Sequence, residues 1–243
     1  MIATGTDAPM TASELEPHPD KAVDGKGALV CLVGIDGSGK STLAKALVAA
    51  AQENGVRCRY VYGGFTSSFT IFRPAVALAK ALVFRGNDHM ETSTTKGRVL
   101  RHPRLSAAYQ YLALTDYIVQ IWFRIRLPLA LGWNVVCDRY IYDLVASIGV
   151  LLDYSLDRTL ALLRRCLAFV PRPHLTFLLD LPEALAYQRK DDIVSLDFLA
   201  ARREIYLEMA RHHEITLLDA SASQKHLQQT VAARVFTVFK GEA

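Results

Sequence analysis

The sequence lacks the marks of several protein classes. It contains no run of five basic residues, and Lys and Arg exceed Asp and Glu by only 28 to 24. A nucleic-acid-binding protein usually concentrates its cations on one segment or face, so we expect mild attraction for anionic substrates and no nucleic-acid partner. The most apolar region, residues 105–137, is interrupted by charged side chains, and no stretch reaches the roughly 18 uncharged residues of a membrane span. We therefore expect no membrane partner.

Cysteine is also scarce, and the spacing of the cysteines does not indicate a metal site. The four cysteines lie far apart and form neither a zinc-binding pattern nor a disulfide framework, so we interpret them as buried reduced thiols. Residues 1–27 are polar, acidic and Pro-containing, without the basic start and apolar centre of a signal peptide. The sequence therefore predicts a disordered N-terminal tail over residues 1–27 and a cytoplasmic protein.

The remainder of the chain alternates short apolar runs with helical segments. Such alternation predicts an α/β fold, in which helices cover both faces of a parallel sheet, within a single domain over residues 28–243. The expected strands are 28–33, 57–62, 134–138, 174–181 and 215–218. The expected helices are 41–54, closed by Gly55, then 74–84, 105–128, 142–152 and 157–170, and a closing helix with Leu227, Val231, Val235 and Val238 on one face.

A phosphate-binding loop follows the first expected strand. Residues 34–41 read Gly-Ile-Asp-Gly-Ser-Gly-Lys-Ser, with glycines where the backbone must turn sharply and present its amides to a β-phosphate. Lys40 would reach the β- and γ-phosphates, and Ser41 would hold Mg²⁺. A chance match in a Gly-containing turn is the alternative, but the flanking strand and helix are the context that the motif requires. The loop predicts a phosphotransferase that uses ATP and Mg²⁺.

A second candidate group closes the third expected strand, which reads VVCDRY. Ligand-binding residues collect at the carboxyl edge of a parallel sheet. Asp138 at that edge can orient a hydrated Mg²⁺, and Arg139 can neutralise phosphate charge through a bidentate contact. The alternative is a solvated Asp-Arg pair that merely ends a strand; the nearby phosphate loop favours the functional interpretation.

Three segments together resemble thymidylate kinases: GIDGSGKST at residues 34–42, CDRY at 137–140 and LTFLLDLPEALAYQRK at 175–190. The resemblance extends from about residue 28 to the C-terminus. It implies a P-loop kinase fold with a five-stranded parallel sheet, and a nucleoside monophosphate kinase that moves the γ-phosphate of ATP to dTMP to give dTDP. It also implies a homodimer, because homodimers are common in that family.

The resemblance assigns roles to individual residues. Lys40 and Arg139 would act in catalysis, and Ser41 and Asp138 would hold the metal. Asp36 would approach the acceptor sugar, and Arg139 would also organise the acceptor phosphate. The nucleotide-binding residues that it implies are Gly34, Asp36, Gly37, Ser38, Gly39, Lys40, Ser41 and Thr42.

Catalytic charge is expected from outside the phosphate loop. Family members either carry a basic residue inside the loop or supply one from a lid over ATP. Gly37 and Ser38 are not basic, so the resemblance assigns this role to a lid over residues 189–195, where Arg189 and Lys190 begin a charged break. Phosphoryl transfer requires positioned positive charge. An equally open interpretation is that both cations only complement the negative end of the preceding helix.

The acceptor side departs from the family pattern. Where the family has Arg-Glu-Pro-Gly-Gly-Thr, residues 62–66 keep only the glycines and the threonine. The Ser-Ser and Tyr-Gln elements after CDRY are replaced at residues 142–144 and 147–148, and an expected arginine after Asp116 is Tyr117. In the family these positions line the acceptor pocket. The chain therefore leaves the pattern where the base would bind and keeps it where phosphates would bind.

Other acceptor candidates come from the polar region that precedes the long helix. Arg73 is the candidate for gripping the acceptor phosphate, with a plain surface arginine as the alternative. Residues 86–104 predict a long mobile loop whose arginines either close over an anionic acceptor or only keep the loop solvated. The aromatic residues that could stack on a base, although core packing is their commoner fate, are Phe65, Phe69, Tyr109 and Tyr117.

Two further functions stay open at this stage. The acceptor could be another small phosphate or hydroxyl compound, because the pocket is altered. The chain could also be a non-catalytic nucleotide-binding regulatory protein, against which the retained Lys40, Ser41, Asp138 and Arg139 argue. An acceptor screen separates the first of these from a dTMP kinase, and any turnover excludes the second.

Overall fold

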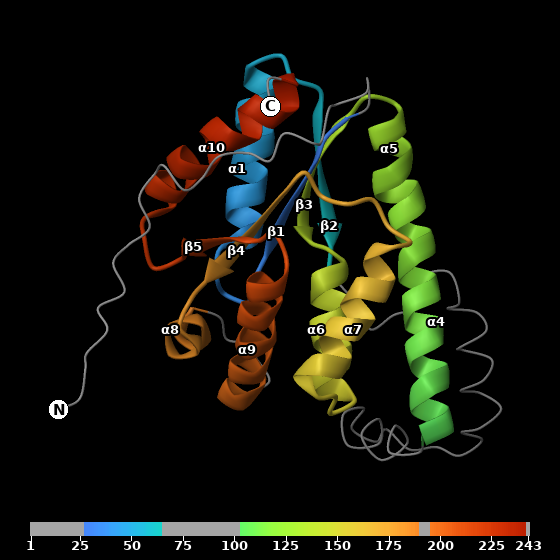
Figure 1. Ribbon diagram of the computed structural model, residues 1–243. Coiled ribbons are helices and arrows are strands. Elements are labelled where there is room, and N and C mark those ends of the chain that lie inside the picture. Colours follow the sequence, from blue (N-terminus) through green and yellow to red (C-terminus); the bar gives the residue numbers. More distant parts are fainter. Residues whose placement is uncertain (1–26, 65–102, 190–194, 242–243) are drawn as a thin grey trace, which may run out of the picture.

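The computed structural model describes residues 27–64, 103–189 and 195–241. Five parallel strands form one sheet in the order β2-β3-β1-β4-β5 (Figure 1). The strands are β1 (Leu29–Val33), β2 (Cys58–Gly63), β3 (Asn134–Arg139), β4 (Leu175–Asp180) and β5 (Thr216–Asp219). Each lies within two residues of an expected strand, so the predicted α/β class and the five-stranded parallel sheet are confirmed.

Helices cover the sheet on both sides. In Figure 1, α1 and α10 lie together on one side, and α4, α6 and α7 form a group on the other. The helices are α1 (Lys40–Glu53), α4 (Pro103–Ile121), α5 (Leu127–Ala130), α6 (Ile141–Leu151), α7 (Leu156–Leu167), α8 (Glu183–Gln188), α9 (Leu196–His212) and α10 (Gln224–Lys240). None of the helices in these described stretches is both long enough and apolar enough to cross a membrane.

The expected closing helix is confirmed in position and in its buried face. Leu227, Val231, Val235 and Val238 of α10 are all buried. They recur every three or four residues, which is the spacing that places side chains on one face of a helix. Gly55 follows α1 with a φ of +73°, the left-handed conformation expected where that helix ends.

The long helix after residue 103 is less regular than the sequence predicts. It passes from α4 into a π-helical turn, Trp122–Arg126, and then into α5, which ends at Ala130. Pro128 is the second residue after this turn and lacks the N–H that a regular helix would bond to a carbonyl one turn earlier. The wider turn places the proline in the first turn of α5, where its missing donor costs little. Pro128 therefore changes the helix locally, and the helix ends two residues later.

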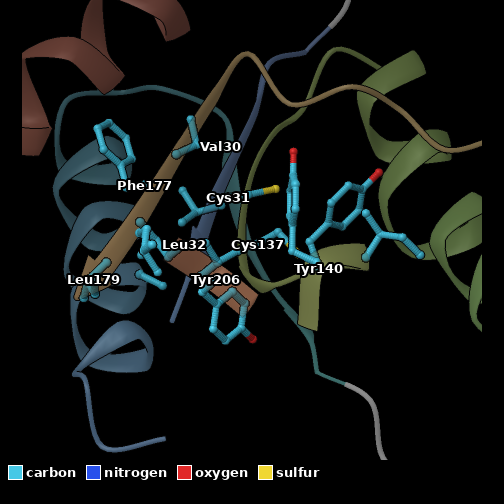
Figure 2. Close-up of a cluster of buried hydrophobic side chains, with 14 of the residues drawn as sticks. Val30, Cys31, Leu32, Cys137, Tyr140, Phe177, Leu179 and Tyr206 are labelled. Carbon is cyan, nitrogen blue, oxygen red and sulfur yellow. The ribbon is translucent and has the colours of Figure 1, made fainter. Parts of the chain in front are cut away.

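The core lies along the central strands. All five residues of β1 are buried, and Phe177 and Leu179 of β4 pack in the same cluster (Figure 2). Cys31 and Cys137 are paired across β1 and β3, and all four cysteines are free and buried, as predicted. A strand that is buried on both faces reads as a continuous apolar run, which explains why LVCLV was a clear signal.

Several predicted features lie outside the described residues. The tail before Gly27, the expected helix 74–84 and most of the loop 86–104 are among them, as are residues 190–194 of the expected lid. Gly27, the last residue of the predicted tail, is buried and donates its N–H to the carbonyl of Leu129. The carboxyl ends of β1, β2 and β3 meet at one edge of the sheet, where the candidate site lies.

Candidate active site

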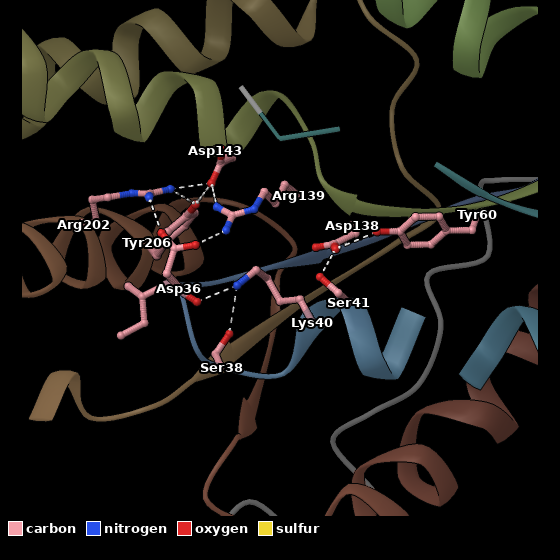
Figure 3. Close-up of polar contacts among 11 residues, drawn as sticks. Asp36, Ser38, Lys40, Ser41, Tyr60, Asp138, Arg139, Asp143, Arg202 and Tyr206 are labelled. Atoms are coloured by element: carbon pink, nitrogen blue, oxygen red, sulfur yellow. Dashed lines mark hydrogen bonds and ion pairs between the residues drawn. The ribbon is translucent and has the colours of Figure 1, made fainter. Parts of the chain in front are cut away.

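The phosphate loop connects β1 to α1, as the sequence predicts. Lys40 is the first residue of α1, and its side chain is only 4% exposed. Its Nζ donates to the carbonyl of Ile35 at 2.5 Å and to Oγ of Ser38 at 3.1 Å (Figure 3). Burial, with the nearby Arg139 charge, lowers the pKa of Lys40 to about 7. The Lys40 ammonium thus bonds to oxygens of its own loop, those of Ile35 and Ser38. From this position it could exchange them for phosphate oxygens.

Ser41 and Asp138 meet beside the loop. The Oγ of Ser41 donates to Oδ2 of Asp138, and the hydroxyl of Tyr60 donates to the same oxygen at 3.0 Å (Figure 3). Burial and the adjacent Asp138 raise the pKa of Tyr60 to about 12, so the phenol stays a donor. Asp138 is fully buried, and its Oδ1 has no hydrogen-bond partner among the described residues. Ser41 and Asp138, both predicted to hold the metal, thus lie in direct contact, and Oδ1 of Asp138 is available to bind a ligand.

Arg139 is held by two carboxylates. It donates from Nη2 to Asp36 and from Nη1 to Asp143 at 2.5 Å. Arg202 of α9 contacts the same two carboxylates, with its Nη1 3.1 Å from Oδ2 of Asp36. The hydroxyl of Tyr206 donates to Asp143 at 2.8 Å. The four charged side chains close a ring at the end of β3 (Figure 3).

The charges of this ring reinforce one another. Burial by itself would raise the pKa of Asp143, but Arg202 and Arg139 hold it well below its ordinary value. The pKa of Asp36 is likewise lowered: its burial is outweighed by the positive charges of Arg139, Arg202 and Lys40. Both carboxylates are therefore ionised at neutral pH, and the two guanidiniums carry matching positive charge.

The backbone at the end of β3 adopts an unusual conformation. Arg139 and Tyr140 have φ values of +80° and +132°, in a region that costs a non-glycine residue of the order of 1–3 kcal/mol. The Tyr140 side chain is fully buried, and its hydroxyl donates to the carbonyl of Pro171 at 2.7 Å. This anchor holds the strained junction in place. The junction in turn directs Arg139 toward the phosphate loop while β3 passes into α6.

A cavity of about 680 Å³ opens over the phosphate loop. It brings together the loop, Arg139 and Arg189, which lie far apart in the sequence. The Nη1 of Arg189 donates to the carbonyl of Ala220 at 3.4 Å. The far wall is the segment 220–224, directly after β5. Sequence reasoning missed this segment, although its place at the carboxyl end of a parallel strand is a usable signal.

The three tyrosines at the departures from the family pattern have different environments. Tyr142 is 4% exposed, and its ring lies 6.3 Å from that of Tyr140 in the core, so the expectation that it lines an acceptor pocket is wrong. Tyr117 is buried, and its hydroxyl donates to the carbonyl of Gly63. Tyr62 is 38% exposed at the end of β2. Of these three, Tyr62 alone presents its ring to solvent near the site.

Most of the other predicted site residues lie in segments that the structure does not describe. Arg73, Lys190, Arg98, Arg101, Phe65 and Phe69 lie outside the described residues. Tyr109 on α4 is partly buried. The sequence also missed Asp143, Arg202, Tyr206 and Tyr60, which make contacts with predicted site residues. The one available signal was the acidic Asp143, which follows the Asp138-Arg139-Tyr140 sequence after two intervening residues.

Comparison with known proteins agrees with this geometry. The sequence model of the thymidylate kinase family matches residues 91–231, more than half of the chain. A probable thymidylate kinase of Methanosarcina acetivorans is 27% identical over 86% of this chain and 96% of its own length. One of Pyrococcus abyssi is 28% identical over the same shares. A thymidylate kinase of Xanthomonas campestris pv. campestris is 33% identical over 64% of this chain and 57% of its own length. The chain therefore belongs to the thymidylate kinase family.

Proposed function

We propose that this protein moves the γ-phosphate of ATP to dTMP and releases ADP and dTDP. The observation that carries the proposal is the convergence, around one cavity, of a complete phosphate loop with Arg139 and Arg189. Phosphoryl transfer is catalysed mainly by positioning and by fixed positive charge. The names of the relatives, probable thymidylate kinase and thymidylate kinase, supply the acceptor.

The donor side follows from the phosphate loop. Residues 36–42 line the cavity, and their backbone amides would receive the β-phosphate at the N-terminal end of α1, where the helix dipole favours negative charge. Lys40 would leave the carbonyl of Ile35 and bind the β- and γ-phosphates. The buried lysine exchanges two neutral oxygens for anionic ones, which restores its full positive charge and strengthens binding.

A Mg²⁺ ion fits beside Ser41 and Asp138. The partnerless Oδ1 of Asp138 is a buried acceptor, and hard oxygen donors are what Mg²⁺ prefers. Within residues 27–64, 103–189 and 195–241, no group of three or more His, Cys, Asp or Glu side chains could hold a metal ion. Mg²⁺ commonly binds through one or two protein oxygens and completes its coordination with phosphates and water. When bound, it would neutralise charge on the phosphates, while Tyr60 keeps Asp138 in orientation.

Arg189 and Arg139 are the candidate cations for the transferred phosphate. Arg189 lies on the cavity wall at the start of the proposed lid, residues 189–195, and Arg139 lies at the carboxyl edge of the sheet. Charge from both sides would stabilise the oxygens of the γ-phosphate as it leaves ADP. The acceptor phosphate supplies its own anionic nucleophile, so the residues need only hold it in line.

The acceptor site is proposed at the end of β2, beside Tyr62 and Arg139. Asp36 keeps its proposed place near the acceptor sugar, since it lines the cavity, although its two oxygens accept from Arg139 and Arg202. Arg73 remains a proposed phosphate ligand. Family membership favours a nucleoside monophosphate over another phosphate or hydroxyl compound. The retained catalytic set favours turnover over a non-catalytic nucleotide-binding protein.

Residues 28–243 are proposed to form one P-loop kinase domain, preceded by a tail and carrying the 86–104 loop. A cytoplasmic location is proposed because the four cysteines are free and because the cytosol keeps thiols reduced.

A homodimer is proposed through the outer face of the α4–α5 helix. Large apolar side chains are exposed along this helix, including Phe123 at 68% in the π-helical turn and Leu131 at 64% directly after α5, and exposed apolar surface marks interaction sites. Size-exclusion chromatography with light scattering tests it, and Phe123→Glu should give a monomer. A wild-type monomer at micromolar concentration would contradict the proposal.

An acceptor panel tests the proposed reaction. Purified protein with ATP and Mg²⁺ is assayed for ADP release in the presence of dTMP, dUMP, dCMP and small hydroxyl compounds. The proposal predicts release that depends on dTMP. Release with a different acceptor would replace dTMP and keep the kinase, and no acceptor-dependent release would remove the proposed function.

A further inference from the structure

The four charged side chains at the end of β3 form a closed unit, here called the ion-pair ring: Asp36, Arg139, Asp143 and Arg202. The side chains of Asp36 and Arg139 are 21% and 11% exposed, whereas those of Arg202 and Asp143 are only 4% and 3% exposed. The first two residues line the cavity. Arg202 and Asp143 are more deeply buried and do not line it.

Within the ring, Arg139 shares both of its carboxylate partners with Arg202. Asp36 and Asp143 each bind Arg139 and also bind Arg202. Tyr206, one turn after Arg202 on α9, donates to Asp143 and accepts from Arg202 Nη2 at 3.1 Å. The direction of the Arg139 guanidinium is therefore set by two carboxylates that α9 holds in place.

Stability alone does not explain Arg202. A buried ion pair costs several kcal/mol of desolvation per ion, and an apolar replacement of the whole pair is often as stable. Arg202 also leaves its Nε buried, with no hydrogen-bond partner in the part of the chain that the structure describes. A side chain that is costly to bury, and incompletely satisfied, is better explained by what it does to its neighbours.

Charge balance shows what Arg202 does. The ring carries two negative and two positive charges, so its net charge is zero. Without Arg202, one guanidinium would face two ionised carboxylates beside the phosphate-binding cavity. Arg139 would then be drawn toward the carboxylates and away from phosphate, and the surplus negative charge would oppose an anionic ligand.

We propose that Arg202 is a positioning residue, which acts through Asp36 and Asp143 to hold Arg139 in the orientation in which it binds the transferred phosphate. The inference rests on the proposed function in one respect, namely that Arg139 meets phosphate in the reaction. Helix α9 then takes part in organising the site, because its Arg202 contacts Asp36 of the phosphate loop.

The test uses three variants of the full chain. Arg202→Met removes the charge and keeps most of the side-chain volume. Asp143→Asn combined with Arg202→Met removes one charge of each sign, so that only the Asp36–Arg139 pair is left and the net charge is again zero. The control is Arg203→Met, on the same helix. Arg203 pairs with Asp180 at 2.7 Å and with Glu183 at 3.0 Å, outside the ring.

Steady-state kinetics and ATP binding are measured for each variant after its fold is checked by circular dichroism. For Arg202→Met we expect kcat to fall about 100-fold, the effect of misplacing a catalytic group by about 1 Å. The dissociation constant of ATP should change less than about threefold, because loop amides and Lys40 dominate that step. The double variant should recover kcat to within about tenfold of wild type. Arg203→Met should lower thermal stability without this kcat effect.

Slow ATP hydrolysis without an acceptor provides the second readout. This reaction needs the ATP-binding side of the site and Arg139, but no acceptor. If no acceptor is phosphorylated by wild type, the proposed function fails, and the hydrolysis rates of the same variants still decide on Arg202. A folded Arg202→Met that keeps wild-type rates would overturn the inference. The inference would also be overturned if the double variant were as slow as Arg202→Met, or if Arg203→Met lost as much kcat as Arg202→Met. Absence of any ATP hydrolysis and transfer in wild type would remove the role of Arg139 and the inference with it.

Discussion

Gly37→Ala should damage nucleotide binding far more than it damages stability. Gly37 has a φ of +83°, where a side chain costs about 1–2 kcal/mol. A Cβ at this position would also lie 2.7 Å from the carbonyl oxygen of Ala186, whereas ordinary contact begins at 3.4 Å. That oxygen belongs to the backbone of α8 and cannot rotate away like a side chain. The phosphate loop must therefore shift by about 0.7 Å.

The shift displaces the amides that receive the β-phosphate. Because a misplacement of about 1 Å can cost about 100-fold in rate, we expect kcat/KM for ATP to fall by about that factor. The conformational cost alone should lower the melting temperature by about 2–8 °C in a domain of this size. The assay combines thermal melting with steady-state kinetics over a range of ATP concentrations.

Gly55→Ala is the matched control. Gly55 has a φ of +73°, but nothing lies within 4 Å of a Cβ there. It should show a similar loss of melting temperature with unchanged kcat/KM for ATP. A folded Gly37→Ala that binds ATP like wild type would refute the contact with Ala186 as a constraint on the loop, and equal kinetic losses in both variants would refute the distinction between them.

Three further changes test other parts of the site. Lys40→Met should lower kcat more than about 100-fold while the fold is kept, since it removes the charge that meets the γ-phosphate; unchanged turnover would exclude the loop from the mechanism. Arg189→Ala should lower kcat more than it raises KM for ATP, and a pure KM effect would assign Arg189 to ground-state binding only. Asp143→Asn should flatten the acid dependence of stability, because the lowered pKa of Asp143 stabilises the fold above about pH 4 and this contribution is lost as pH falls further. The slope of the unfolding free energy, measured with urea below pH 4, should drop by up to about 1.4 kcal/mol per pH unit, and an unchanged slope would contradict the ionised state of Asp143.

The sheet was predictable because its signals are local. β1 is a continuous apolar run, and the phosphate loop that follows it has a fixed spacing with few alternatives. Asp138 and Arg139 were found for the same reason, since they end an apolar strand. The meeting of Ser41 with Asp138, which lie 97 residues apart, followed from the parallel sheet.

The rest of the site depends on contacts that no local pattern encodes. Arg202 lies in the middle of a helix with ordinary helical neighbours, and only the packing of α9 against α6 makes it a partner of Asp143. The position of Tyr142 in a family motif predicted that it lines the acceptor pocket. In helix α6, however, its side chain turns into the core, and the side chain of its neighbour Asp143 faces Arg139. One residue of helix turns a side chain by about 100°, which was enough to exchange the two roles.

The most direct test of the account follows the phosphate itself. Purified protein is incubated with Mg²⁺, dTMP and ATP labelled at the γ-phosphate, and the nucleotides are separated by chromatography. The account predicts label in dTDP, formed in step with ADP and abolished in Lys40→Met. Label released only as inorganic phosphate, or retained in ATP while dTMP and the other monophosphates stay unlabelled, would contradict it.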